Sequence, residues 1–154
     1  MANWDKRIME LALHTASWSK DPSRQVGAVI FNPSTHAVIS QGYNGFHRGA
    51  DDSVLEHCDR DYRLMRTAHA EANAIYNAAR HGVAVGGMSV MSTLYPCAPC
   101  ALAITQSGIC EVITYEPDWK VDRYAADFAA SKEIFARANV TVRFLEPEAV
   151  CQTA

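Results

Sequence analysis

Apolar residues recur at helical spacing over residues 4–20 and predict an amphipathic helix there. The residues at this spacing are Ile8, Leu11, Ala12, Thr15 and Trp18. The pattern then changes to a continuous β-prone run over residues 26–31, which is typical of a buried strand. A turn follows, and residues 37–43 predict a second strand, so the two strands are predicted to form a hairpin.

The second half of the chain alternates between helical and extended patterns. It predicts helices over residues 68–80, 97–107 and 124–138, and strands over residues 88–94, 109–115 and 140–145. Residues 44–67 fit neither pattern and are interpreted as a long loop with some helix near residues 59–66. This order predicts an α/β fold, with one sheet of about five strands and helices on both faces.

Length and charge narrow the function classes. The 154 residues fit a single domain, residues 1–154, with its own hydrophobic core. The net charge of −3 disfavours long nucleic acid as a partner, because its backbone needs many Lys and Arg contacts, whereas a mononucleotide needs few. No apolar stretch reaches the roughly 18 residues that cross a membrane, and the first residues lack a secretory signal, so we expect a cytoplasmic protein.

The five cysteines are irregularly spaced, which argues against a disulfide framework, and two of them belong to a metal-binding motif. Cys97 and Cys100 lie at positions i and i+3 at the start of a predicted helix, which places both sulfurs on one face. His69 opens another predicted helix, and Glu71 follows in its first turn. This H-x-E…P-C-x-x-C pattern is the signature of zinc-dependent nucleobase deaminases. The sequence therefore predicts a Zn²⁺ cofactor held by His69, Cys97 and Cys100.

Glu71 is predicted to be the catalytic residue rather than a ligand. Three protein ligands leave one zinc position for a water molecule, whose pKa falls towards roughly 7. The hydroxide attacks a ring carbon that carries an amino group, and Glu71 moves the protons to the ring nitrogen and the departing ammonia. These residue types therefore predict hydrolytic deamination of a nucleobase.

A structural zinc site is the main alternative that the residues leave open. Such a site needs a fourth protein ligand. The candidates for that ligand are Cys58, Cys110, His57 and His81. The chain would then be a non-catalytic zinc module that binds nucleotides or another protein. Glu71 favours the catalytic interpretation, because a closed site has no use for a carboxylate beside the metal. His47 and His57 could bind a second metal, or they could be two unpaired surface histidines.

Five segments carry a resemblance to a known family. They are QVGAVI (residues 25–30), GYNG (42–45), HAEANAI (69–75), TLYPCAPCA (93–101) and QSGI (106–109). The chain resembles the cytidine deaminase superfamily, and in particular its deoxycytidylate (dCMP) deaminase family. The resemblance implies a three-layer α/β/α cytidine-deaminase-like fold with a five-stranded mixed sheet, zinc-dependent deamination of dCMP to dUMP, and a homo-oligomer, either a hexamer or another dimer-based assembly. Parts of the family are regulated by dCTP and dTTP, so these nucleotides are candidate effectors.

The resemblance also implies substrate contacts. Asn44 is similar to the side chain that holds the sugar hydroxyl, and the backbone N–H of Ala70 is similar to the group that contacts the pyrimidine carbonyl. The candidates for binding the 5′-phosphate are Ser23, Arg24, Arg48 and Arg123. Each has an ordinary structural alternative, because Asn44 could cap a turn and the arginines could be solvated or paired on the surface.

Two residues depart from the family pattern next to the expected pocket. His47 stands where Pro is frequent, and Tyr95 stands where a small residue is frequent. Trp119 could cover the pocket or pack in an interface. Deaminases of free nucleosides or bases, of riboflavin synthesis and of tRNA adenosine belong to the same superfamily and remain alternatives. The tRNA enzyme needs a basic face, which a net charge of −3 does not supply.

Overall fold

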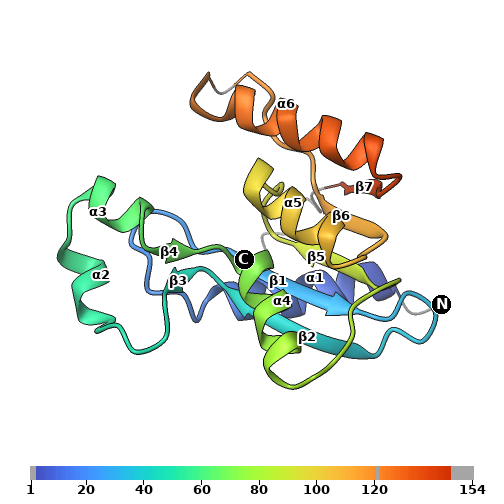
Figure 1. Cartoon of the computed structure of the whole chain (residues 1–154), viewed down its shortest axis with the longest axis horizontal. Coiled ribbons are helices and arrows are strands. Elements are labelled where there is room, and N and C mark those ends of the chain that lie inside the picture. Colours follow the sequence, from blue (N-terminus) through green and yellow to red (C-terminus); the bar gives the residue numbers. More distant parts are fainter. Residues whose placement is uncertain (1–2, 121, 147–154) are drawn as a thin grey trace, which may run out of the picture.

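Five strands form one mixed sheet in the order β2-β1-β5-β6-β7 (Figure 1). The structure is a computed structural model that describes residues 3–120 and 122–146, without the side chains of residues 55, 56, 122 and 123. The strands are β1 (Gly27–Phe31), β2 (Val38–Tyr43), β5 (Ser89–Ser92), β6 (Glu111–Tyr115) and β7 (Thr141–Leu145). β1 pairs antiparallel with β2 and with β5, whereas β5, β6 and β7 run parallel. The predicted hairpin and the five-stranded mixed sheet are confirmed.

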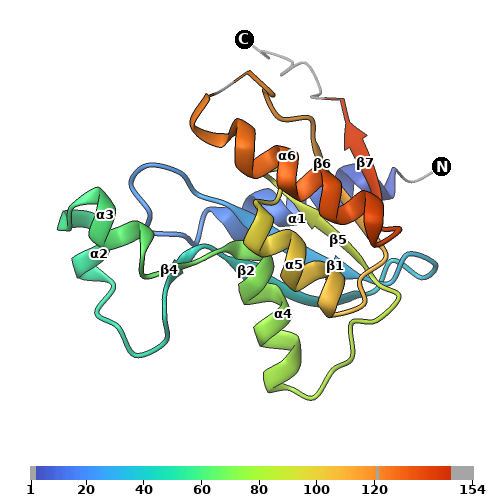
Figure 2. The same cartoon turned by 45° about the horizontal axis from the view of Figure 1, so that its top comes forward.

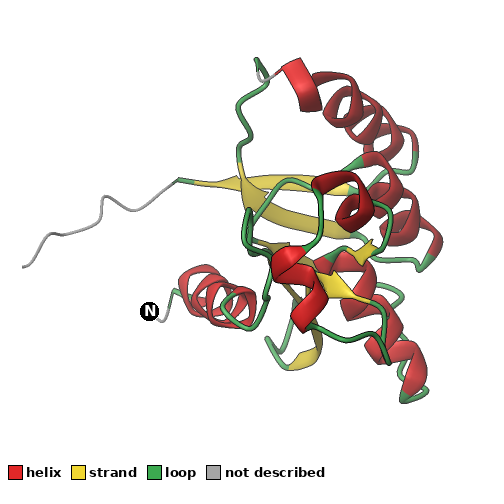
Figure 3. Cartoon of the chain, turned by 90° about the vertical axis from the view of Figure 1, so that its left-hand side faces the viewer, coloured by secondary structure: helices red, strands yellow, loops and turns green. Residues whose placement is uncertain are grey.

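Helices cover both faces of the sheet (Figure 2 and Figure 3). One face carries α1, and the opposite face carries α4, α5 and α6. The bounds of these helices are α1 (Trp4–Ala16), α4 (Ala70–Arg80), α5 (Ala98–Gln106) and α6 (Asp122–Arg137). The three layers confirm the predicted α/β/α fold. Within the described ranges, no helix combines the length and the apolar composition that crossing a membrane requires.

Each face of the sheet buries its own apolar cluster. On the α1 side, Ile8 and Met9 belong to one cluster with Met91 of β5. On the other side, Phe135 of α6 lies in a larger cluster with Ile30 of β1. Because helices cover both faces, every residue of β1 is buried. This explains why the sequence of β1 is continuously apolar instead of alternating.

The first helix and the segment before α4 differ from the sequence-based expectation. α1 ends at Ala16 rather than near residue 20, and the Ser17 hydroxyl donates to the His14 carbonyl at 2.6 Å. Residues 44–67 contain the expected helix, α3 (Arg60–Leu64), but also elements that were not predicted. These are α2 (Ser53–His57) and a two-stranded ribbon of β3 (Gly45–Phe46) with β4 (Thr67–Ala68). Strands of two residues are too short to show a period in the sequence.

Gly42 allows α4 to lie directly on β2. A Cβ atom at this position would lie 2.5 Å from the carbonyl oxygen of Ala70 and would also contact the backbone nitrogen of Ala74. The Gly42→Ala change is expected to push α4 away from the sheet and to lower the free energy of unfolding by about 1–3 kcal/mol, as overpacking does. Denaturant unfolding measures this loss.

Gly45→Ala is the matched control, because the nearest atom to its new Cβ is Cε2 of Tyr43 at 3.9 Å. The control is expected to change stability much less than Gly42→Ala. Equal stability of Gly42→Ala and the parent protein would contradict the close approach of α4 to the sheet.

Candidate active site

Three metal-ligating side chains meet between the starts of α4 and α5. His69 is the N-cap residue of α4, and Cys97 is the N-cap residue of α5. Nδ1 of His69 lies 3.1 Å from Sγ of Cys97 and 3.5 Å from Sγ of Cys100. The three donor atoms all lie within 4.8 Å of one another. The structure thus brings together the three predicted zinc ligands, which lie 28 and 31 residues apart along the chain.

This donor set fits zinc. Ligand atoms at about 2.0–2.3 Å from one tetrahedral zinc ion lie roughly 3.5 Å apart, close to the separations seen here. One imidazole and two thiols also match the N and S donors that zinc prefers. In the described part of the chain, no fourth His, Cys, Asp or Glu joins the group. Among the described residues, the arrangement thus has the three ligands of an open zinc site rather than the four of a closed structural one.

Protons are shared unevenly among the three donors. Hydrogen bonds from the Cys100 thiol and from His69 lower the pKa of Cys97 to about 5. The hydrogen bond that Cys100 gives to Cys97, together with burial, raises the pKa of Cys100, which therefore keeps its proton. The hydrogen bond to Cys97 likewise raises the pKa of His69 to about 8. A divalent cation that takes all three donors must displace the protons of Cys100 and His69.

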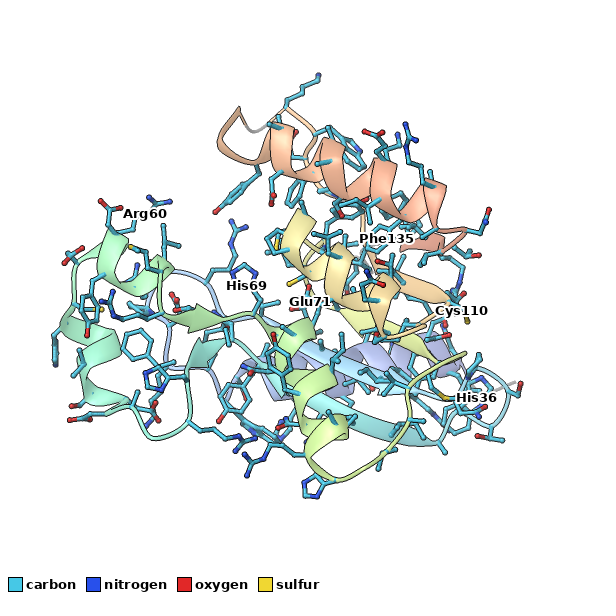
Figure 4. All side chains as sticks on the ribbon, viewed as in Figure 1. His36, Arg60, His69, Glu71, Cys110 and Phe135 are labelled. Carbon is cyan, nitrogen blue, oxygen red and sulfur yellow. The ribbon has the colours of Figure 1, made fainter. Side chains whose placement is uncertain are left out.

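Glu71 places a buried carboxyl group beside these donors. It is 4 % exposed, and its Oε1 accepts a hydrogen bond from Oγ of Ser92 at 2.9 Å. Figure 4 shows Glu71 close to His69 at the start of α4. Burial raises the pKa of Glu71, and the nearby Cys97 thiolate raises it further. A raised pKa moves a carboxyl group towards the range in which it can both accept and release a proton, which suits general acid–base catalysis.

A cavity of about 450 Å³ opens in front of this group. His69, Glu71 and Cys97 line it, whereas Cys100 is buried behind. The remaining wall comes from the turn at residues 21–26, from α3, from residues 94–95 and from α6. The substrate-binding predictions Ser23, Arg24, Asn44 and Ala70 all lie in this wall. A cavity of this size accommodates a small organic ligand.

Asn44 braces the cavity wall. Its Oδ1 accepts the backbone N–H of Val26 at 2.8 Å, and its Nδ2 donates to the carbonyl oxygen of Arg24 at 2.9 Å. It is buried and lies directly after β2. Both ends of the Asn44 amide thus bind the backbone of the segment that leads into β1. Asn44 therefore does more than cap the Tyr43–Gly45 turn, which was the alternative.

Of the two other predicted phosphate ligands, Arg48 lies elsewhere, and the side chain of Arg123 is not described. Arg48 lines a separate cavity of about 140 Å³, where its guanidinium donates to Oδ1 of Asn77. The geometry therefore gives no support to a phosphate contact by Arg48. Arg123 lies in the first turn of α6, but its side chain is outside the described part of the structure.

Several residues that the sequence did not single out as site residues also line the large cavity, and four of them have polar groups that bear on the site. These four are Arg60, Arg63, Tyr124 and Asp127. Oδ1 of Asp127 accepts the backbone N–H of Ala98 at 3.2 Å and so caps the helix that carries Cys100. Arg60 and Arg63 lie three residues apart on α3. Their i, i+3 spacing is the one signal in the sequence that could have paired them, once α3 is recognised.

Of the remaining candidates, only Tyr95 lines the large cavity. Among the described residues, His47, His57, His81, Cys58 and Cys110 form no metal-binding group. Tyr95 lines the large cavity and His47 does not, so one of the two departures from the family pattern borders the site. The Trp119 ring packs edge-on against Tyr95 at 5.3 Å between centroids, and its Nε1 donates to Glu116. Trp119 thus supports the cavity wall from behind, without lining the cavity.

Comparison with known proteins agrees with this geometry. Residues 2–116 match the family model described as the cytidine and deoxycytidylate deaminase zinc-binding region. A deaminase of Aliivibrio fischeri, from the luxG 3′ region, is 37% identical over 148 residues, which cover 94% of this chain and 95% of the relative. Human deoxycytidylate deaminase is 36% identical over 152 residues, which cover 94% of this chain and 81% of the relative.

The fold comparison points the same way. The apo crystal structure of dCMP deaminase from the cyanophage S-TIM5 matches with a TM-score of 0.74 at 21% identity, covering 94% of this chain and all of that one. At that identity the match shows the shared fold, while the family model and the sequence relatives show descent. The chain belongs to the family of zinc-binding cytidine and deoxycytidylate deaminases.

Proposed function

We propose that this protein is a zinc-dependent hydrolase that converts dCMP to dUMP and releases ammonia. The observation that carries the proposal is the buried carboxyl group of Glu71 in the same cavity as an open group of one imidazole and two thiols. A non-catalytic zinc module has no need for this combination. The name of the human relative, deoxycytidylate deaminase, supports the choice of substrate.

His69, Cys97 and Cys100 would hold the metal. When bound, zinc supplies a Lewis acid that makes water nucleophilic at neutral pH. Glu71 accepts the proton of the attacking water at a carboxylate oxygen and passes protons to N3 of the pyrimidine and to the amino group at C4. The hydroxyl of Ser92 orients the carboxylate, because it donates to Oε1 of Glu71. Burial of Glu71 excludes bulk water, which would otherwise compete for these protons.

The wall of the cavity supplies the contacts that a nucleotide needs. The backbone N–H of Ala70 lies at the free N-terminal end of α4 and suits the pyrimidine carbonyl. Asn44 suits the deoxyribose hydroxyl, and Ser23 and Arg24 suit the 5′-phosphate. Arg123, at the start of α6, remains a proposed phosphate ligand. Residues 1–154 are proposed to form one domain that contains all of these groups.

Assembly and location are proposed on separate grounds. Exposed apolar side chains on the outer helices, Tyr76 of α4 at 56 % and Leu102 of α5 at 52 %, support a homo-oligomer, such as a hexamer or another dimer-based assembly. The thiols of Cys97 and Cys100 must stay reduced to bind zinc, which supports a cytoplasmic location. The family resemblance supports dCTP and dTTP as effectors. Sedimentation of the protein with and without dCTP and dTTP tests the oligomeric state and whether these nucleotides change it.

A substrate panel tests the proposed function. Ammonia release is measured with cytosine, deoxycytidine, dCMP, CMP and dCTP, and zinc content is determined on the same sample. We expect kcat/KM for dCMP to exceed that for deoxycytidine by at least about tenfold, since one hydrogen bond to a charged group contributes about 1.5–3 kcal/mol. Higher kcat/KM with deoxycytidine would assign the protein to nucleosides, and no release from any substrate by the zinc-loaded protein would refute deamination of cytosine.

A further inference from the structure

Residues 47–66, here called the flap, project from one end of the molecule. Figure 1 shows α2 and α3 of the flap beyond the β3–β4 ribbon and away from the five-stranded sheet. The ribbon pairs Gly45 with Ala68 and Phe46 with Thr67, so the flap leaves and returns at the same point. Its α3 nevertheless contributes Arg60, Arg63 and Leu64 to the wall of the active-site cavity.

Arg63 joins the flap to the turn at residues 21–24. Its Nη2 donates to Oγ of Ser23 at 2.7 Å, and its Nε lies 3.5 Å from Oδ2 of Asp21. The side chains of Arg63 and Asp21 are only 10 % and 11 % exposed. Another ion pair of the flap, between Lys20 and Asp52, is more than half exposed on both sides and therefore contributes little.

Asp21 extends this contact to the backbone of the turn. Its Oδ1 accepts the N–H of Ser23 at 2.8 Å and the N–H of Arg24 at 3.1 Å. Arg63 binds the other carboxylate oxygen, so one carboxylate connects α3 to two consecutive residues of the turn. The conformation that brings Ser23 and Arg24 to the cavity is thus linked to the position of Arg63.

The chemistry of Ser23 adds to this constraint. Its hydroxyl oxygen accepts a hydrogen bond from Arg63, so its own hydrogen is left to donate to another acceptor. The turn at residues 21–26 and α3 together contribute Arg24, Arg60 and Arg63 to the cavity wall but only one carboxylate, Asp21, whereas the carboxylates of Glu71 and Asp127 come from α4 and α6, so the end formed by the turn and α3 is positively charged. Figure 4 shows Arg60 on α3, well separated from Glu71 at the other end of the site. A dianionic phosphate suits the positive end, with the base towards Glu71.

We propose that Arg63 is a positioning residue that holds Ser23 and Arg24 for the 5′-phosphate, so that discrimination between nucleotide and nucleoside depends on the flap. This inference rests on the proposed deamination of dCMP. Arg63 acts through the turn at residues 21–24 and not on the reacting atoms. Its loss therefore weakens nucleotide binding and leaves the chemistry at the pyrimidine ring intact.

Arg63→Met tests the proposal, because it keeps the length of the side chain and removes both polar contacts. We expect KM for dCMP and the Kd for dUMP to rise about tenfold or more, with little change in kcat, in zinc content or in kcat/KM for deoxycytidine. Arg63→Lys is expected to recover part of the loss, because an ammonium can make one of the two contacts but lacks the guanidinium fork. Arg66→Met is the matched control. It removes a charge from an exposed arginine of the same flap that contacts the Tyr62 ring and carbonyl.

A double-mutant cycle separates positioning from direct contact. If Arg63 acts through Ser23, the change in KM caused by Arg63→Met is much smaller in a Ser23→Ala background. Independent, multiplying effects would overturn the proposal, as would equal effects of Arg63→Met on dCMP and deoxycytidine. If Arg63→Met does not fold, Arg63→Lys decides, through the ratio of kcat/KM for dCMP to kcat/KM for deoxycytidine. An inactive parent protein would refute the proposed function itself. If the parent is active and the variant keeps the parent's ratio of kcat/KM for dCMP to kcat/KM for deoxycytidine, only the role of Arg63 is refuted.

Discussion

Replacing Glu71 by Gln is expected to lower kcat for dCMP by about 10²–10⁴-fold while zinc remains bound, since general acid–base catalysis supplies a factor of that size. The amide keeps the volume of the carboxyl group and can still accept the hydrogen bond from Ser92. It cannot accept the proton of the attacking water at neutral pH. Ammonia release gives kcat, and elemental analysis of the same sample gives the zinc content.

Glu133→Gln provides the matched control for this change. Glu133 is exposed, pairs with Arg137 four residues further along α6, and does not line the active-site cavity. The control is expected to retain the activity of the parent protein. Turnover by Glu71→Gln at a rate close to the parent would remove Glu71 from the mechanism and would favour a site in which another group moves the protons.

Replacing Cys97 by Ser is expected to abolish zinc binding and, with it, both activity and a large part of the stability. Binding that is selective for the folded state stabilises by about 4 kcal/mol when free zinc is 1,000 times its Kd. The variant should therefore unfold at the temperature at which the chelator-treated parent protein unfolds, and added zinc should not raise that temperature. Thermal unfolding with and without zinc measures both effects.

Cys110→Ser is the control, because Cys110 is exposed and lies outside the donor group. A zinc content of Cys97→Ser equal to that of the parent would contradict the assignment of ligands.

The pH dependence of zinc binding provides a second check of the ligands. Since the pKa of His69 is raised to about 8 and that of Cys100 is also raised, protons compete with zinc at neutral pH. Zinc affinity is expected to fall as pH falls below about 8, with proton release on binding.

The parts of the site that follow from local sequence were predictable. His69 and Cys97 are N-cap residues, and helix starts are marked by short-range changes in pattern. Cys100 follows from its i+3 spacing to Cys97. A sheet of about five strands with helices on both faces could likewise be predicted, because helices and strands alternate with clear periods from residue 68 onward, whereas the spatial order of the strands came only from the structure.

The parts that depend on distant contacts were not predictable from the pattern. Arg63 meets Ser23 across 40 residues, and this requires the position of α3, which is set by a ribbon of two residues per strand. Arg48 and Arg24 have similar sequence surroundings, rich in turn residues, yet they face different cavities. Spacing along the chain identifies donors that share one helix, but not which arginine reaches a shared cavity.

A crystal structure of the zinc-loaded protein with dUMP tests the central claim most directly. We expect one zinc ion on Nδ1 of His69 and on the sulfurs of Cys97 and Cys100, with its fourth position free of protein atoms and facing Glu71. The pyrimidine should lie in the cavity with C4 towards that position and the phosphate near Ser23 and Arg24. A fourth amino-acid ligand on the ion, closing the site, would contradict the assignment as a hydrolytic deaminase.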